Sequence, residues 1–242
     1  LVYFLSEAGL AGRDIGYDQN FKYNLEIRKA FEKIVSTHDN SDPDFAKVLE
    51  YAKRMWFANG IHHHYGMAKF KAEFSKEQLL KLLSEAKTTL SPEAIEAIFS
   101  DKYSKRKDKD PTKDMIASSA NNFYGEGVTQ KMVEEFYAAK IDKTDKKPIS
   151  YGLNSTMELV DGKLTEVVWK SGGKYGKSID KIVFWLEKAL TVAENDAQKK
   201  GFELLIEYYK TGDLKLWDEY NIVWAGDTKG DIDYINGFIE VY

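Results

Sequence analysis

The chain of 242 residues has no cysteine, only four prolines and no long apolar segment. Without cysteine there can be no disulfide framework, thiolate zinc site or cysteine nucleophile, which fits a reducing compartment and predicts a cytoplasmic location. The longest apolar runs, such as residues 182–186, are far shorter than the roughly 20 residues that a membrane helix requires. No basic segment precedes the apolar residues 1–5, so we predict no signal peptide and no membrane partner.

The chain also lacks an excess of charge of either sign. Its 35 basic and 39 acidic side chains are interspersed and give a formal net charge of −4. Proteins that bind nucleic acid need a basic surface to displace counterions from the phosphates. We therefore predict no nucleic-acid partner. The length suits one large domain or two small ones.

The first 140 residues show the hydrophobic periodicity of helices. Apolar residues recur at helical spacing over residues 21–34. Another helix is predicted to begin with Pro43 in its first turn and to end at Asn59-Gly60. Further helix starts are predicted from residues that cap N-termini: Ser75 with Gln78 in a capping box, Ser91 and Thr129.

The later part of the chain changes to the alternating pattern of strands. Residues 157–160 and 163–169 flank Asp161-Gly162, which predicts a β-hairpin on a two-residue turn. The other elements predicted here are a long helix at about 175–210 and two strands at 222–224 and 232–242. The predicted fold class is α+β: a single mixed lobe over residues 1–242, helix-rich to about residue 140, with an antiparallel sheet or partial β-barrel over about 148–242.

Neither end of the chain carries the usual boundary signals. Residue 1 is leucine, and apolar positions at helical spacing begin there without a capping residue before them. The last residues stop on an apolar strand pattern with no turn after it. We therefore expect the chain to be part of a longer polypeptide.

Two segments that could carry chemistry have simpler structural interpretations. His62-His63-His64 could bind a metal, but consecutive side chains rarely converge on one ion and no HExxH pattern is present, so we interpret the run as a loop. Residues 101–114, rich in lysine and aspartate, are predicted to be a solvated surface loop.

Residues 171–178 (Ser-Gly-Gly-Lys-Tyr-Gly-Lys-Ser) lie between a predicted strand and a predicted helix and end as a phosphate-binding loop does. The phosphate-loop pattern requires glycine where Ser171 stands. The preceding strand also belongs to a hairpin rather than to a parallel βαβ unit. Nucleotide binding through residues 172–178 stays open as an alternative, although a flexible turn before a helix is favoured.

The C-terminal strand pattern is more informative. In an extended chain alternate side chains share a face, so Phe238, Glu240 and Tyr242 would point to the same side. A carboxylate and a phenol would then stand about 6.6 Å apart along the strand. Such a pair can bind a cationic group and donate a hydrogen bond to a developing oxyanion. The same pattern also fits a half-exposed strand without a catalytic role.

A set of segments in order along the chain resembles bacterial members of the dipeptidyl peptidase III family. The most specific are Gly152-Leu153-Asn154-Ser155 and the closing Gly237-Phe238-Ile239-Glu240-Val241-Tyr242. The resemblance extends over nearly the whole chain through further segments at residues 5–8, 12–15, 17–20, 60–65 and 181–189.

The resemblance implies a two-lobed zinc exopeptidase that releases dipeptides from the N-termini of oligopeptide substrates. In this family an HExxGH helix and a second glutamate hold the zinc, and neither motif occurs here. It implies that Glu240, with Phe238 beside it, binds the substrate's N-terminal ammonium, and that the catalytic Tyr242 donates to the scissile carbonyl. We therefore hypothesise that this chain is the part of such an enzyme that lacks the zinc-binding lobe. This chain would bind no metal, would be inactive alone and would have the missing lobe as its partner. A non-catalytic peptide-binding module is the other alternative.

Overall fold

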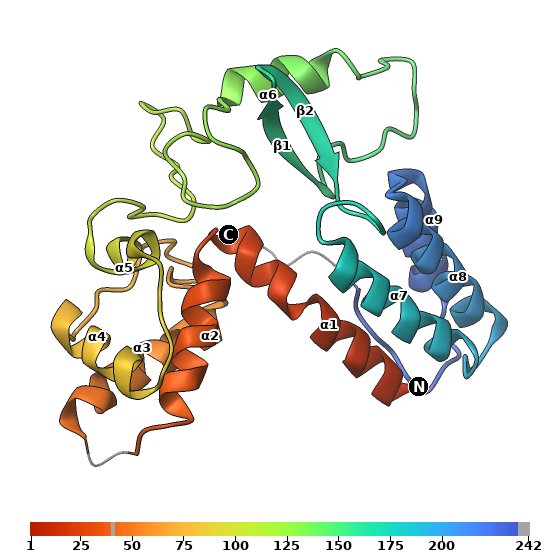
Figure 1. Cartoon of the computed structure of the whole chain (residues 1–242). Coiled ribbons are helices and arrows are strands. Elements are labelled where there is room, and N and C mark those ends of the chain that lie inside the picture. Colours follow the sequence, from red (N-terminus) through yellow and green to blue (C-terminus); the bar gives the residue numbers. More distant parts are fainter. Residues whose placement is uncertain (40–41, 237–242) are drawn as a thin grey trace. The chain divides into compact units, whose positions relative to one another are not determined.

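The computed structural model describes residues 1–39 and 42–236. These residues form two compact units (Figure 1): residues 1–15 with 123–236 make the first unit, and residues 16–39 with 42–122 make the second. The predicted site residues Phe238, Glu240 and Tyr242 lie outside the described residues, and so does the end of the strand predicted at 232–242.

Helices and ordered loops build the second unit around one apolar core. The helices are the end of α1 (Val2–Asn20), α2 (Asn24–Val35), α3 (Pro43–Ala58), α4 (Lys76–Glu85) and α5 (Pro92–Phe99). Their apolar faces meet in a cluster that excludes solvent, with Phe21, Phe31, Met55, Leu79 and Leu82 among its fully buried side chains. Phe21 is buried although it precedes the first turn of α2, because it fills the space beside the ring of His62.

The local signals read from the sequence define these helix ends as predicted. Asp42 caps α3 through a side-chain bond to the amide of Asp44, and Asn59 ends that helix in the left-handed conformation. Ser75 and Gln78 form the complete capping box of α4. Ser91 caps α5, and Thr129 caps α6 (Gln130–Ala138) of the first unit. These predictions held because capping is decided by residues within one turn of each other.

The first unit combines a hairpin with helices. Strands β1 (Ser155–Val160) and β2 (Lys163–Val168) pair antiparallel, with Ser155 opposite Val168 and Val160 opposite Lys163. The turn residues Asp161 and Gly162 both have positive φ, as a two-residue hairpin turn requires. The other elements are residues 2–15 of α1, α6, α7 (Gly176–Leu190), α8 (Asp196–Thr211) and α9 (Leu214–Gly226).

Two predictions for the first unit were wrong. The long helix expected over 175–210 is two helices, because Asn195 caps a new helix by accepting from the amide of Gln198. The strand expected at 222–224 is part of α9, which Asp213 caps. The local Ile-Val-Trp sequence favours a strand, but Leu214, Trp217 and Tyr220 at helical spacing bury against α8 and outweigh that preference.

The fold class is α+β, as predicted. The described residues contain a two-stranded antiparallel sheet and no barrel, and residues 232–236 form neither strand nor helix. The predicted partial barrel, and the strand predicted to begin at residue 232, are therefore not found in the described residues, where a single hairpin supplies the sheet. Among the described helices, none combines the length and apolar composition needed to cross a membrane.

Candidate functional site

The described residues end directly before the predicted site residues, so the structure shows the segment of chain that precedes them. Residues 232–236 lead into the segment that carries Phe238, Glu240 and Tyr242. We call residues 232–236 the approach segment. It lies against α8 and α9 of the first unit.

The antiparallel pair α8 and α9 forms the support for the approach segment. Gly212 ends α8 at positive φ, and Asp213 starts α9 at the next residue. The short connection forces the two helices together and buries Phe202, Leu205 and Tyr220 between them and α7. Because both helices are fixed by this apolar packing, polar side chains on their surface have defined positions.

Five contacts hold the approach segment on this support. Gln198, only 4% exposed, donates from Nε2 to the carbonyl of Ile232 at 3.1 Å, and a Glu194 carboxylate oxygen accepts from the Ile232 amide at 2.9 Å. The Trp224 indole donates to the carbonyl of Tyr234 at 2.7 Å. The two remaining contacts are the stacking of Tyr234 on Phe202, with ring centroids 5.1 Å apart, and the hydrogen bond from the Tyr209 hydroxyl to Asn236 Oδ1 at 3.1 Å.

The phenols in this region stay protonated at neutral pH. Burial raises the pKa of Tyr209 above its ordinary value, although the hydrogen bond to Asn236 lowers it in part. Burial likewise raises the pKa of Tyr234 to about 12 and that of Tyr220 further. A neutral phenol keeps its proton for donation, so the bond from Tyr209 to Asn236 persists across the physiological pH range.

The Gly-Leu-Asn-Ser segment joins the hairpin to the α8–α9 connection. Asn154, 3% exposed, donates from Nδ2 to the carbonyl of Gly212 at 3.0 Å, and its own carbonyl accepts from the amide of Trp169 at 2.8 Å. Sequence reasoning singled out this segment only through the family resemblance. The structure gives it a supporting role in the same unit as the approach segment.

A second polar group lies at the start of the hairpin. The Glu166 carboxylate accepts from Tyr137 and Ser155 through Oε1, both at 2.9 Å, and from Lys140 through Oε2 at 2.6 Å. Burial alone would raise the pKa of Glu166, but hydrogen bonds from these three donors lower it below its ordinary value. All of the carboxylate's strong contacts are internal, which makes it a structural anion.

In the second unit, two segments of the family resemblance come together. Asn20 donates to the carbonyl of Asn59 at 2.9 Å, and buried Asn24 accepts from the amide of Ile61 at 3.1 Å. The Arg106 guanidinium donates to Asn20 Oδ1 and to the carbonyl of His64, both at 3.0 Å. The segment around residues 17–20 and the histidine run are therefore joined by side chains that sequence spacing could not bring together.

The histidines of that run point to different environments. His62 is buried and donates from Nε2 to the carbonyl of Tyr103 at 2.8 Å, and burial lowers its pKa to about 4. His63 Nδ1 accepts from the amides of Tyr65 and Gly66, which closes a turn. The His64 ring packs against Tyr65. This agrees with the interpretation of the run as a structural loop.

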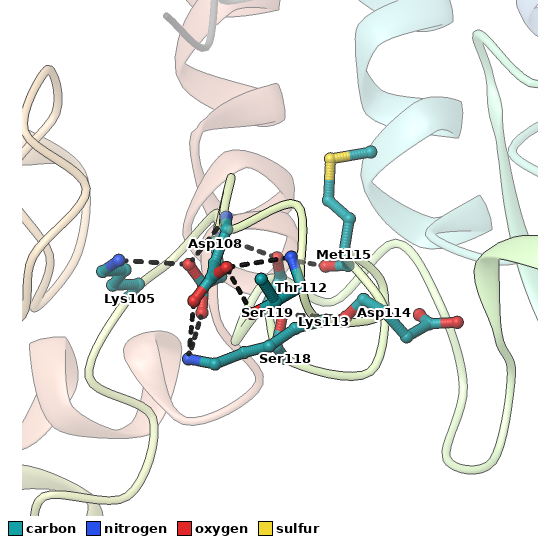
Figure 2. A network of polar contacts seen from close by, with 9 residues as sticks. Lys105, Asp108, Thr112, Lys113, Asp114, Met115, Ser118 and Ser119 are labelled. Atoms are coloured by element: carbon teal, nitrogen blue, oxygen red, sulfur yellow. Dashed lines mark hydrogen bonds and ion pairs between the residues drawn. The ribbon is translucent and has the colours of Figure 1, made fainter.

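The lysine- and aspartate-rich loop is more ordered than predicted (Figure 2). Asp108 was expected to be solvated, yet its side chain is 6% exposed and lies between the ammonium groups of Lys105 at 3.1 Å and Lys113 at 3.2 Å. The Asp108 amide also donates to the Ser119 hydroxyl at 2.8 Å. Hydrogen bonds from Lys105 and Lys113 hold the pKa of Asp108 below its ordinary value. The expectation of a fully solvated loop was therefore wrong at this residue, because its charges pair inward.

The nucleotide alternative gains no support from residues 171–178. Strand β2 before them pairs antiparallel with β1, as the sequence argument against a phosphate loop assumed. Lys174 is engaged in an ion pair with Glu158 at 2.8 Å, and Ser171 donates to Asp180. Two polar side chains of the turn are thus engaged within the unit.

A resident zinc ion does not fit the described residues. In residues 1–39 and 42–236 no three or more His, Asp or Glu side chains are grouped to hold a metal ion. The zinc that the family resemblance implies has no ligand set in this part of the chain, so no chemical step is derived through it.

Comparison with known proteins identifies the family of the chain. The model of peptidase family M49 matches residues 99–242, more than half of the chain, and the chain therefore belongs to that family. This confirms the resemblance seen in the sequence. No curated protein matches the chain.

Two solved structures are similar to the chain in fold. DPP III from Caldithrix abyssi has a TM-score of 0.56 and 18% identity over 95% of this chain and 33% of that chain. Dipeptidyl-peptidase III from Corallococcus sp. strain EGB has a TM-score of 0.52 and 14% identity over 96% of this chain and 33% of that chain. The chain thus spans about one third of the length of either structure.

Sequence reasoning missed the residues that hold the approach segment. The sequence analysis placed Gln198 and Tyr209 in one long helix and Trp224 in a strand. It therefore could not predict that all three side chains contact residues 232–236. The signal that could have found them is Asn195, which stands three residues before Gln198 as a capping residue and marks a new helix.

Proposed function

We propose that this chain is the non-zinc portion of a zinc-dependent peptidase that removes dipeptides from the N-termini of peptides. The observation that carries the proposal is the match to peptidase family M49 over residues 99–242, which includes the C-terminal motif. The fold likeness to two dipeptidyl peptidase III structures supports it. Its partners in this proposal are oligopeptide substrates and the remainder of the enzyme, which would supply the zinc ligands.

Glu240 is proposed to bind the substrate's free N-terminal ammonium. A carboxylate attracts a charged amine and gains nothing from an acetylated one, so it selects free N-termini and sets where the dipeptide is counted from. Phe238, two residues earlier on the same strand face, is proposed to contact the same end of the substrate.

Tyr242 is proposed to stabilise the oxyanion. Its phenol would donate a hydrogen bond to the scissile carbonyl oxygen as that oxygen becomes negative. Such a donor acts mainly in the transition state and is typically worth about 3–4 kcal/mol, or a factor of about 10²–10³ in kcat. The chain by itself is proposed to be inactive, because it contains no HExxGH sequence.

The test uses the complete enzyme with a free dipeptidyl substrate and its N-acetylated counterpart. Tyr242→Phe should lower kcat by about 10²–10³ with little change in KM. Glu240→Gln should raise KM for the substrate with a free N-terminus. The ratio of kcat/KM between this substrate and its acetylated counterpart should therefore fall. Glu219→Gln, an exposed carboxylate on α9, is the matched control and should change neither.

Normal turnover by Tyr242→Phe would contradict the proposed role of the phenol. Dipeptide release by residues 1–242 alone would contradict the division of labour between this chain and the rest of the enzyme. Peptide binding without hydrolysis by the complete protein would favour the non-catalytic binding module.

A further inference from the structure

Helix α1 packs against the first unit along one side. Ala8 is buried, and Gly12 lies so close to Ile182 of α7 that an added Cβ would come within 3.3 Å of the Ile182 Cδ1 atom. The Phe4 ring stacks on Trp185 of α7, with ring centroids 6.1 Å apart. These contacts define which side of α1 faces the apolar cluster of the first unit, beside α7 (Figure 1).

The opposite side of α1 is exposed over residues 2–10 but carries no charged side chain there. The exposed residues of this stretch are Val2, Tyr3, Ser6, Gly9 and Leu10, which we call the outer face of α1. With 3.6 residues per turn, these five positions lie within about 120° of the helix circumference, opposite Ala8. Val2, Tyr3 and Leu10 are 57%, 61% and 58% exposed, so each presents most of an apolar side chain to the surface.

Another helix of the same unit shows the composition of a side that faces water. The exposed residues of α8 are Asp196, Lys199, Lys200, Glu203, Glu207, Lys210 and Thr211. All of these except the last are charged. A helix that is polar on one side keeps that side in water, whereas a helix that is apolar all round is buried. The outer face of α1 therefore has the composition of a covered surface.

Small residues in the outer face leave room for close packing. Ser6 and Gly9 lie between Tyr3 and Leu10 along the helix. A Cβ added at Gly9 would meet no atom within 4 Å apart from the neighbouring backbone of its own helix. The side chains at a contact decide how closely two helices approach, so this position allows a short interaxial distance. The outer face thus suits the apolar side of another helix.

We propose that the outer face of α1 is covered, in the complete enzyme, by an apolar helix face from the polypeptide outside residues 1–242. The inference takes from the proposed function only that this chain is one portion of a longer enzyme. This chain covers 33% of each of the two solved structures of similar fold. In an enzyme of that length, most of the polypeptide that could cover α1 lies outside these residues.

The size of the outer face favours contact within one polypeptide over contact with a second copy of the chain. Each partner in a standard protein–protein interface buries roughly 800 Å². Three apolar side chains and two small residues cannot supply this area. Segments of one polypeptide lose much less translational and rotational freedom when they pack together, so a smaller contact is sufficient to keep them in place.

Cysteine labelling of the complete enzyme tests whether the outer face is covered. Residues 1–242 contain no cysteine, so one substitution introduces a single thiol into this part of the chain. Ser6→Cys exchanges one atom in the middle of the outer face. Its matched control is Ser84→Cys, an exposed position of α4 with exposed Lys81 and Glu85 beside it.

In the folded enzyme a maleimide should label Ser6→Cys about tenfold more slowly than Ser84→Cys, because a covered site reacts only after local opening. Mass spectrometry measures each rate on the peptide that carries the substitution, and the rate in urea corrects for differences in reactivity. The result should not depend on enzyme concentration.

Photo-cross-linking identifies what covers the outer face. Tyr3 is replaced by the photoreactive p-benzoylphenylalanine, which keeps an aromatic ring at this position. Irradiation of the complete enzyme should join the peptide that contains residue 3 to peptides from outside residues 1–242 of the same molecule.

Three outcomes overturn the inference. Equal labelling rates for Ser6→Cys and Ser84→Cys would show that the outer face stays in water. Cross-links confined to residues 1–242, or cross-links between two molecules whose yield rises with enzyme concentration, would show that the proposed occupant is wrong. Neither measurement depends on turnover: normal activity of Tyr242→Phe would contradict the proposed catalytic role alone, and equal labelling beside an impaired Tyr242→Phe would contradict the covered face alone.

Discussion

The two units of the chain place their buried polar groups differently. In the second unit, buried Asn24, His62 and Arg106 tie loops to helices and to one another inside the unit. In the first unit, buried Asn154 and Gln198 each donate to a single backbone carbonyl far along the chain, those of Gly212 and Ile232. The comparison teaches that the second unit is cross-linked by several buried polar side chains bonded to its loops, whereas the buried amides of the first unit each secure one connection or segment.

Gly60→Ala in the second unit should show the largest effect. Gly60 has a φ of 148°, and an added Cβ would overlap the side-chain amide of buried Asn24. Backbone strain and the lost space should together cost about 4 kcal/mol in the free energy of unfolding. Urea unfolding measures the total, and hydrogen exchange of peptides from residues 16–122 locates it. In an Asn24→Ala background the cost should be smaller, and an unchanged cost would show that the clash is not the cause.

Acidification should weaken the second unit through His62. The unfolded histidine takes up a proton near pH 6.5, whereas burial keeps the folded one neutral down to about pH 4. Stability is therefore complete above the unfolded pKa and is lost as pH falls from about 6.5 to about 4, by about 3 kcal/mol.

Comparison with His62→Gln isolates this titration. The amide of glutamine can still donate to Tyr103 but does not titrate, so the stability difference between pH 7 and pH 4.5 should be smaller in the variant. Burial lowers the pKa of His38, but hydrogen bonds to Ile34 and Glu85 outweigh burial and leave this pKa above its ordinary value. Because His38 is present in both proteins, its contribution to the pH dependence cancels in the comparison. Identical pH profiles would contradict the assignment to His62.

Truncating one buried asparagine in each unit tests the comparison directly. Asn24→Ala leaves the Ile61 amide without its side-chain acceptor and removes one donor from the Tyr17 carbonyl, which keeps the Phe21 amide. Asn154→Ala removes the side-chain donor to the Gly212 carbonyl. Each substitution should lower the free energy of unfolding by about 2 kcal/mol. Asn24→Ala should have the larger effect, because the Asn24 side chain makes two bonds to the backbone. Hydrogen exchange should place the loss in residues 16–122 for Asn24 and near residues 151–169 and 208–216 for Asn154. Losses spread over both units in either variant would break the distinction.

The smallest effect is expected at Lys113. Its ammonium is exposed, and Lys105 remains beside Asp108 when Lys113 is truncated. Lys113→Ala should therefore shift Tm by no more than about 2 °C, as exposed ion pairs contribute little. Asp108→Ala is the informative contrast, because it removes the buried partner of both lysines. A large shift for Lys113→Ala would mean that the loop depends on each of its charges.

Several parts of the fold follow from residues within one turn of each other. Both ends of α3, the starts of α4 and α5 and the hairpin turn at Asp161-Gly162 were predicted correctly, because each depends on a cap or a turn residue in place. The break between α7 and α8 was missed although Asn195 marks it locally as a cap. The helical state of residues 222–224 was missed because packing of α9 against α8 decided it. The order of the motif segments along the sequence also indicated the family, because such segments can be recognised without knowledge of the tertiary structure.

The amino-acid sequence alone determined both ends of α3, the starts of α4, α5 and α6, the hairpin, the α+β class and membership of the peptidase family, all of which depend on local spacing or on motif identity. Only the tertiary structure decided that Asp108 is buried, that His62 donates to the carbonyl of Tyr103, and that Tyr209 meets Asn236 across 27 residues of chain. Such contacts depend on which helix faces meet, and that follows from the packing of the whole unit rather than from any short stretch of sequence.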